Sequence, residues 1–158
     1  MTIPLKPQTR RAFCAQACQA ASLAAIGTLA TACGGSTTAP SSTSAPALAS
    51  VAATVAGRVV SVAIAAGSAL TSVGSAATVQ TSLGTFLLAR TGQDTFTALT
   101  AVCTHEGCTV SGFASSQFVC PCHGSQYSTS GAVVVGPATR SLQSFATQFA
   151  NGVLTFTA

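Results

Sequence analysis

Two short stretches of the sequence, CTHEGC at residues 103–108 and CPCHGS at residues 120–125, each contain two cysteines and one histidine. The only two histidines of the chain, His105 and His123, lie in these stretches, together with four of its seven cysteines. Thiolate sulfur and imidazole nitrogen are ligands of zinc and of iron–sulfur centres. Two loops that carry both kinds of donor could therefore hold one metal centre between them.

Two kinds of metal centre are compatible with these donors. A structural zinc site takes four ligands in tetrahedral geometry, but common zinc fingers pair cysteines as C-x2-4-C and histidines as H-x3-5-H, unlike this spacing. A Rieske 2Fe–2S centre takes two cysteines on one iron and two histidines on the other. Each stretch can supply one cysteine and one histidine to such a centre. A disulfide-stapled domain without metal would leave both histidines unexplained.

Taken together, CTHEGC and CPCHGSQY resemble the two cluster-binding boxes of the Rieske family, in the disulfide-containing branch found in cytochrome bc-type complexes. The resemblance implies one 2Fe–2S cluster, with Cys103 and Cys120 as ligands of the inner iron. It implies His105 and His123 as ligands of the outer iron, nearer solvent. Neutral imidazole ligands lower the negative charge of the cluster and so favour its reduction.

The resemblance also assigns roles to four residues that are not ligands. Cys108 and Cys122 match the disulfide that ties the two loops together, and a disulfide needs an oxidising compartment. Ser125 and Tyr127 occupy positions where high-potential members place hydroxyl donors, which stabilise the reduced cluster. On that basis we expect a midpoint potential of roughly +100 to +300 mV.

Two further features bear on the cluster environment. Gly136 and Pro137 resemble the start of a third loop that covers the cluster in this family, although Thr139 stands where a second proline is frequent. Glu106 stands where quinol-oxidising members usually carry an apolar residue. A carboxylate beside an exposed ligand histidine would disfavour docking into an apolar pocket, which weighs against quinol chemistry but not against the cluster.

The body of the chain predicts an all-β fold, a small antiparallel sandwich or barrel with two cluster-binding loops. Seven to ten short strands are expected, separated by Gly- and Ser-rich breaks, and residues 65–77 are expected to be a loop. The predicted strands are residues 59–64, 86–90, 95–102, 109–113, 117–120, 132–135, 141–145 and 153–157. Six phenylalanines are expected in the core: Phe86, Phe96, Phe113, Phe145, Phe149 and Phe156.

The N-terminal residues 1–32 are predicted to be an export signal or an N-terminal anchor. A basic start with Arg10 and Arg11 precedes an apolar, alanine-rich run, as in signals of the twin-arginine type, and an ordinary secretory signal is the alternative. Ala30 and Ala32 precede Cys33 as in a lipoprotein cleavage site, so Cys33 is a candidate for lipidation. An uncleaved membrane anchor and a soluble secreted form are the other two options.

The expected organisation is completed by a flexible Ser/Thr/Pro/Ala linker over residues 33–54 and a cluster-binding domain over residues 55–158. Charged residues make up only 5% of the chain, and no basic face for nucleic acid is present. The predicted location is the periplasmic side of a bacterial cytoplasmic membrane, with the chain tethered through its N-terminus.

Two classes of function follow from the resemblance. The first is the Rieske subunit of a membrane quinol:cytochrome c-type oxidoreductase, in which a partner chain binds the quinol. The second is an exported one-electron carrier, or the small subunit of an arsenite-oxidase-like enzyme. The expected partners are cytochromes of b and c type or a molybdenum oxidoreductase, and the chain alone is not expected to be catalytic. The lipoprotein-like Cys33 and the carboxylate of Glu106 favour the second class.

Overall fold

The computed structural model describes residues 45–158, and the regular structure in this range is entirely β. In this part of the chain no helix is long and apolar enough to cross a membrane. The strands are β1 (Ala49–Val51), β2 (Thr54–Ala56), β3 (Val59–Ala63), β4 (Ala76–Thr81), β5 (Gly84–Arg90), β6 (Phe96–Thr100), β7 (Gly112–Ala114), β8 (Gln117–Val119), β9 (Gln126–Ser128), β10 (Val133–Val135), β11 (Ser144–Phe145), β12 (Thr147–Ala150) and β13 (Val153–Thr157).

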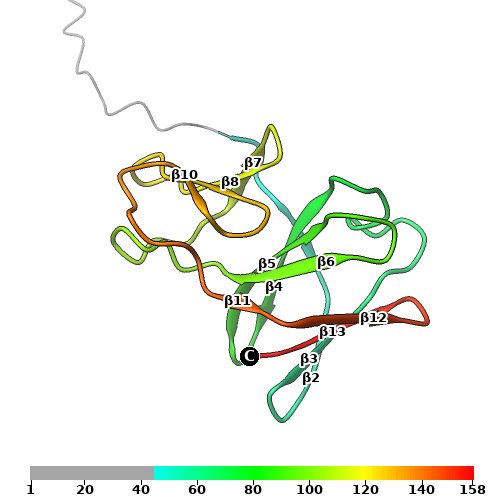
Figure 1. The fold of residues 1–158 in the computed structure, drawn as a ribbon. Helices are drawn as coiled ribbons and strands as arrows, with labels where there is room; N and C mark the ends of the chain where they lie inside the picture. The colour runs from blue at the N-terminus through cyan, green and yellow to red at the C-terminus, as the bar shows by residue number, and fades with distance from the viewer. Residues whose placement is uncertain (1–44) are drawn as a thin grey trace, which may run out of the picture. The chain divides into compact units, whose positions relative to one another are not determined.

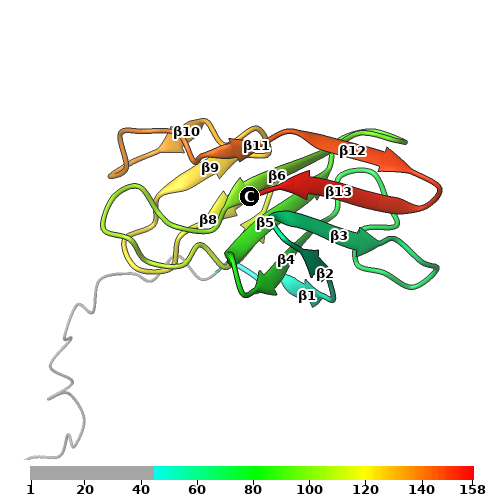
Figure 2. The same cartoon turned by 90° about the horizontal axis from the view of Figure 1, so that it is seen from below.

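These strands form three sheets. A central five-stranded sheet has the order β1-β4-β5-β6-β11, and two four-stranded sheets have the orders β10-β9-β8-β7 and β12-β13-β3-β2. The two smaller sheets lie on different sides of the central sheet (Figure 1, Figure 2). All pairings are antiparallel except that of β1 with β4. The predicted all-β, mainly antiparallel fold is confirmed.

Strand β5 explains why the central sheet has a core on each face. Side chains alternate between the faces of a strand, and the run Phe86-Leu87-Leu88-Ala89 is buried throughout. Phe86 and Leu88 belong to one core with residues of β3 and β13, which we call the distal core. Leu87 and Ala89 belong to a second core with residues of the two cysteine-containing stretches, which we call the loop-side core. A continuous apolar run is thus the sequence signature of a strand covered on both sides.

The beginning of the ordered body differs from the predicted boundary at residue 55. Residues 45–48, which we call the strap, lie along β7: Leu48 N–H donates to the Ser111 carbonyl (2.8 Å), and Ala47 pairs with Gly112. Residues 49–51 then pair with the outer side of β4 as β1. The linker-like composition is overridden here because a sheet edge offers unpaired backbone groups. The predicted export signal, Cys33 and the linker up to residue 44 lie outside the described residues.

Other local predictions were partly wrong. Residues 65–77 were expected to be a loop, but β4 begins at Ala76, and β2, β9 and β12 were not predicted. The expected strand over residues 109–113 is reduced to an isolated bridge at Thr109 and the start of β7. The phenylalanine core is confirmed: Phe86, Phe96 and Phe156 are buried in the distal core, with Phe145 and Phe149 packed against it, and Phe113 packs against the loop-side core.

Candidate metal centre

The two cysteine-containing stretches fold into loops with the same backbone hydrogen bonds. Cys103 and Cys120 each accept at the carbonyl from the N–H four residues later, at 2.9 and 3.0 Å. Each also donates its own N–H to the carbonyl five residues later, at 2.8 and 2.9 Å. Gly107 and Gly124, at the equivalent turn positions, both have a φ of 75°, which glycine adopts without strain. A Cβ atom at position 107 would meet nothing within 4 Å, so conformation rather than space favours glycine there.

The thiols of Cys103 and Cys120 lie side by side in the loop-side core. Both residues are buried, at 3% and 1% exposure, and they are the two cysteines of the described range outside a disulfide. Burial raises the pKa of Cys120, whereas the pKa of Cys103 is lowered because hydrogen bonds, first among them that of Tyr127, outweigh its burial. Two adjacent buried thiols resist double ionisation unless a cation compensates their charge.

The imidazoles of His105 and His123 lie at the exposed tips of the same loops. Their Nδ1 atoms are 3.3 Å apart, and the rings meet edge to face with centroids 4.9 Å apart. The Glu106 carboxylate lies on the other side of one ring, 3.8 Å from His123 Nε2, with 61% of its side chain exposed. The carboxylate that replaces an apolar residue in the predicted box therefore points to solvent beside the imidazole pair.

A disulfide joins the two loops. The Cys108 and Cys122 sulfurs are bonded at 2.08 Å across a sequence separation of 14 residues. This is the pair that the resemblance implies. The bond connects the segment after His105 to the segment before His123, so it restrains the distance between the two tips.

The hydroxyl of Tyr127 reaches the first loop from β9. The side chain is fully buried, and its oxygen lies 3.2 Å from Cys103 Sγ. Burial raises the pKa of Tyr127, so the phenol keeps its proton at neutral pH. Tyr127 can therefore donate a hydrogen bond to a thiolate at Cys103, as its predicted role requires.

The hydroxyl of Ser125 lies between the second loop and the predicted cover loop. Ser125 is fully buried, and its Oγ accepts from the Ala138 N–H at 3.0 Å. Gly136 and Pro137 are exposed, whereas Ala138 is buried in the loop-side core. In the described part of the chain no acceptor takes the Ser125 proton, so this buried donor is available to an acceptor at the centre.

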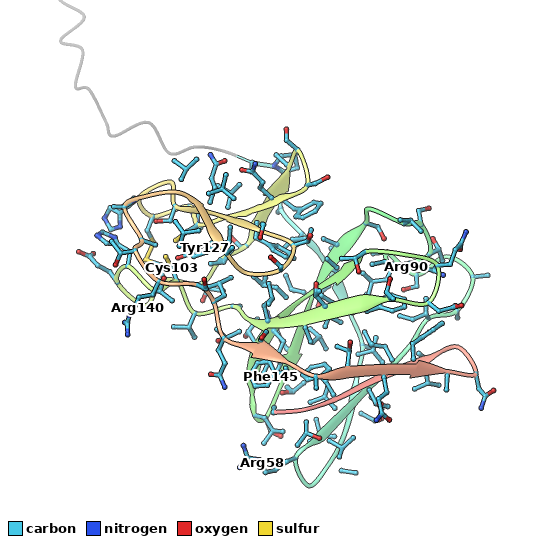
Figure 3. All side chains as sticks on the ribbon, viewed as in Figure 1. Arg58, Arg90, Cys103, Tyr127, Arg140 and Phe145 are labelled. Atoms are coloured by element: carbon cyan, nitrogen blue, oxygen red, sulfur yellow. A yellow bond between two sulfur atoms is a disulfide. The ribbon has the colours of Figure 1, made fainter. Side chains whose placement is uncertain are left out.

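Thr104 and Arg140 are site residues that the sequence reasoning missed. The Thr104 hydroxyl donates to the Arg140 carbonyl at 2.5 Å, which connects the first loop to the cover loop, and it lies 3.1 Å from the Tyr127 oxygen. Figure 3 shows Cys103, Tyr127 and Arg140 at one end of the described body. Threonine inside a C-x-H motif carries no signal of its own, and a backbone acceptor 36 residues away cannot be read from composition.

The arrangement of donors distinguishes a two-iron centre from a single zinc ion. In the described residues, two groups of donor atoms meet within 4.8 Å: Cys108, Cys120 and Cys122, and His105, Glu106 and His123. Cys108 and Cys122 are joined in the disulfide, so Cys120 is the one thiol of the first group, and neither group combines a thiol with an imidazole. One zinc ion, with ligand bonds of about 2.0–2.3 Å, needs its sulfur and nitrogen donors together around one point. The buried thiols of Cys103 and Cys120 and the exposed imidazoles of the histidines form separate sulfur and nitrogen ends, which fit a cluster with two irons.

Comparison with known proteins agrees with this chemistry. The sequence model of the Rieske [2Fe-2S] domain matches residues 61–146, just over half of the chain. The chloroplastic cytochrome b6-f complex iron-sulfur subunit of Bigelowiella natans is 61% identical over 46 residues, 28% of this chain and 18% of that protein. The subunit of the same name from Cyanothece sp. PCC 7425 is 48% identical over 60 residues, 37% of this chain and 34% of that protein.

The chain thus spans at most about a third of the curated relatives described above. Among solved structures, the plasma membrane Rieske protein PetC3 from Synechocystis PCC 6803 is 35% identical, with a TM-score of 0.47 over 51% of this chain and 84% of that one. A chain of the oxygenase–ferredoxin complex of carbazole 1,9a-dioxygenase is 20% identical, with a TM-score of 0.49 over 61% and 92% of the two chains. On the match to the domain model over residues 61–146, the chain belongs to the Rieske family and carries one 2Fe–2S cluster of the Rieske type.

Proposed function

We propose that this chain is an exported one-electron transfer protein in which Cys103, Cys120, His105 and His123 hold the cluster. The observation that carries the proposal is the separation of the donors, with two thiols buried in the loop-side core and two imidazoles exposed above them. The thiols would hold one iron away from water, and the exposed imidazole edges would be accessible to a redox partner. When bound, the cluster accepts and releases single electrons.

The protein groups around the donors support a high potential. The backbone N–H groups of His105 and Glu106 favour the thiolate of Cys103, and those of Cys122 and His123 favour the thiolate of Cys120, since each lowers the pKa of its cysteine. Hydrogen bonds to sulfur stabilise the more negative, reduced state of an iron–sulfur cluster and raise its potential. Tyr127 adds a hydroxyl donor on the Cys103 side, and Ser125 adds one beside the second loop.

A second candidate is the Rieske subunit of a membrane quinol:cytochrome c-type oxidoreductase. The names of the relatives from Bigelowiella natans and Cyanothece favour it, because they are subunits of cytochrome b6-f complexes. The exposed carboxylate of Glu106 beside His123 favours the independent carrier, because docking the tips into an apolar quinol pocket would desolvate that charge. A small subunit of an arsenite-oxidase-like enzyme is the third alternative, with a molybdenum oxidoreductase as partner.

We also propose that the chain is tethered to the periplasmic side of a bacterial cytoplasmic membrane. In this proposal residues 1–32 are a twin-arginine type export signal, Cys33 is the lipidated first residue of the mature protein, and residues 34–44 form the tether of a cluster-binding domain that begins near residue 45. The Cys108–Cys122 disulfide supports an oxidising compartment. Export after folding suits a protein that receives its cofactor in the cytoplasm.

The test is purification of the exported full chain followed by electron paramagnetic resonance and redox titration. The proposal expects two irons and two sulfides per chain, a Rieske-type signal in the reduced state, and loss of that signal in His105→Ala and His123→Ala. Bound zinc, or a colourless protein with iron-free His105 and His123, would contradict it. Reduction by a quinol analogue only in the presence of a cytochrome b partner would favour the quinol-oxidising alternative, and mass spectrometry of the mature N-terminus tests Cys33.

A further inference from the structure

The hydroxyl of Tyr127 has more hydrogen-bond neighbours than it has protons. Its oxygen accepts from the Thr104 backbone N–H at 3.1 Å. It also lies 3.2 Å from Cys103 Sγ and 3.1 Å from Thr104 Oγ1. A phenol has one proton to donate, so the direction of the last two contacts decides how strongly Tyr127 acts on the sulfur.

The direction follows from the partner of Thr104. The Thr104 hydroxyl donates its only proton to the Arg140 carbonyl, which can act only as an acceptor. Thr104 Oγ1 is therefore left with lone pairs toward Tyr127. A cysteine sulfur that holds iron is a thiolate and likewise only accepts. The single Tyr127 proton thus faces two acceptors at nearly equal distances, the Cys103 sulfur and the Thr104 hydroxyl oxygen.

We propose that Thr104 tunes the cluster by competing with the Cys103 sulfur for the Tyr127 proton. The proposal rests on the proposed function, because it needs Cys103 to be an iron ligand. Reduction makes the sulfur more negative, which draws the proton toward Cys103, since charge-assisted hydrogen bonds are the stronger ones. In the oxidised state the proton lies more toward Thr104, which stabilises that state. Thr104 therefore reduces the increase in midpoint potential that the Tyr127 hydrogen bond provides. Thr104 is a positioning residue that acts through Tyr127.

The surroundings of Thr104 make this role separable from a structural one. Thr104 and Arg140 line an open cavity of about 640 Å³ beside the first loop, together with Val102, His105 and other residues of both segments. Arg140 is exposed, so water can reach its carbonyl when the threonine hydroxyl is removed. A valine at position 104 keeps the branched shape and removes only the competing acceptor and its bond to Arg140.

The experiment compares midpoint potentials of the full-length, cluster-loaded protein and its Thr104→Val and Thr104→Ser variants. Thr104→Val is expected to raise the potential, shifting the redox equilibrium about three- to tenfold toward the reduced form, where tenfold corresponds to about 59 mV for one electron. Thr104→Ser keeps the acceptor and is expected to retain the wild-type potential. Thr104→Ala serves as a second variant without the hydroxyl and is expected to shift in the same direction.

The same substitution in a Tyr127→Phe background tests whether Thr104 acts through Tyr127. Thr104→Val is expected to have no effect there, because the shared proton is gone and the two changes are therefore not additive. A Thr104→Val potential at or below that of wild type, or an equal shift in the Tyr127→Phe background, would overturn the inference while the Rieske-type signal remains. Loss of that signal from the wild-type protein would instead contradict the proposed function.

Discussion

Tyr127 shows how much a single buried hydroxyl can contribute at the residue scale. In Tyr127→Phe the ring still fills the loop-side core, but the donor 3.2 Å from the Cys103 sulfur is lost. A hydrogen bond to a charged acceptor contributes about 1.5–3 kcal/mol, and only its difference between redox states counts, so we predict a fall of roughly 50–100 mV in midpoint potential. Redox titration followed by the visible spectrum measures it.

Thr97→Val is the control for this substitution. It removes a partly buried hydroxyl that donates to the Thr129 carbonyl at 2.7 Å and has no hydrogen bond to a cysteine sulfur among the described residues. Its potential should match that of wild type. A Tyr127→Phe potential equal to that of the control would show that the phenol does not act on the sulfur.

The Cys108–Cys122 disulfide restrains the two tips on which the imidazoles lie. Bridges that close loops of this size stabilise a protein by about 2–4 kcal/mol. We predict that Cys108→Ser/Cys122→Ser loses its visible absorbance at a lower guanidinium concentration than wild type, because the loops separate and release the iron. Treatment of the wild type with a reductant that opens the bridge should reproduce this loss, and an unchanged denaturation midpoint in the double variant would contradict the prediction.

The sequence was sufficient to predict the candidate ligands because they lie close together within two short stretches. Cys103 and His105 are two positions apart and Cys120 and His123 three, so the donor types and their spacing stand in the sequence itself. The contact of Thr104 with Arg140 was not predictable, because the acceptor is a backbone carbonyl that any residue at position 140 would provide.

At the scale of elements, β5 divides the molecule into two cores, and neighbouring leucines test this division. Leu87 and Leu88 are both fully buried but belong to the loop-side and distal cores respectively. Each Leu→Ala substitution should cost about 2–5 kcal/mol of unfolding free energy. We predict that Leu87→Ala alone broadens the paramagnetic signal and accelerates iron release to a chelator, since its cavity adjoins the core that contains Cys103 and Cys120. Equal chelation rates in the two variants would show that the cores are not independent.

The strap depends on a close approach at Gly112. A Cβ atom there would lie 2.9 Å from that of Ala45 and 3.3 Å from that of Val119. We predict that Gly112→Val displaces the strap from β7, at a cost of about 1–3 kcal/mol, and speeds hydrogen exchange at the Leu48 and Phe113 amides. Ala63→Val adds side-chain bulk at an exposed position of β3 and should leave those amides protected. Unchanged exchange in Gly112→Val would contradict the prediction.

The sequence predicted β3, β5 and β6 because each contains branched or aromatic residues in recognisable runs, FLLAR above all. It did not predict β4 or β1, whose segments AATVQT and ASV have weak strand propensity. These segments are strands because neighbouring edges pair with them: β4 lies beside β5, and β1 completes the free side of β4. Pairing of this kind depends on partners distant in the chain, so a local pattern does not contain it.

On the scale of the whole molecule, the described body is nearly uncharged. Residues 45–158 contain three arginines and two carboxylates, which gives a net charge of +1. Arg58 donates to the carbonyl of the terminal residue Ala158, and Arg90 donates to the carbonyl of Thr71, so both side chains hold distant backbone segments in place. Electrostatic steering needs clefts or faces dominated by one sign of charge. For the proposed function we therefore expect recognition of a redox partner to depend on shape and on uncharged contacts around the imidazole tips.

We predict that electron transfer to small oxidants responds weakly to salt. Rate constants for ferricyanide and for a cationic cobalt(III) complex should change by less than about threefold between 10 and 500 mM salt, because a net charge of +1 gives little steering. Glu106→Gln should raise the rate constant for the anion ferricyanide more than that for the cationic complex, since it removes a negative charge 3.8 Å from the His123 ring. Asp94→Asn makes the same change in net charge near the start of β6, away from the loops, and should have a smaller effect. Stopped-flow absorbance measures the rates, and equal responses of the two variants would show that electrons do not leave through the histidine tips.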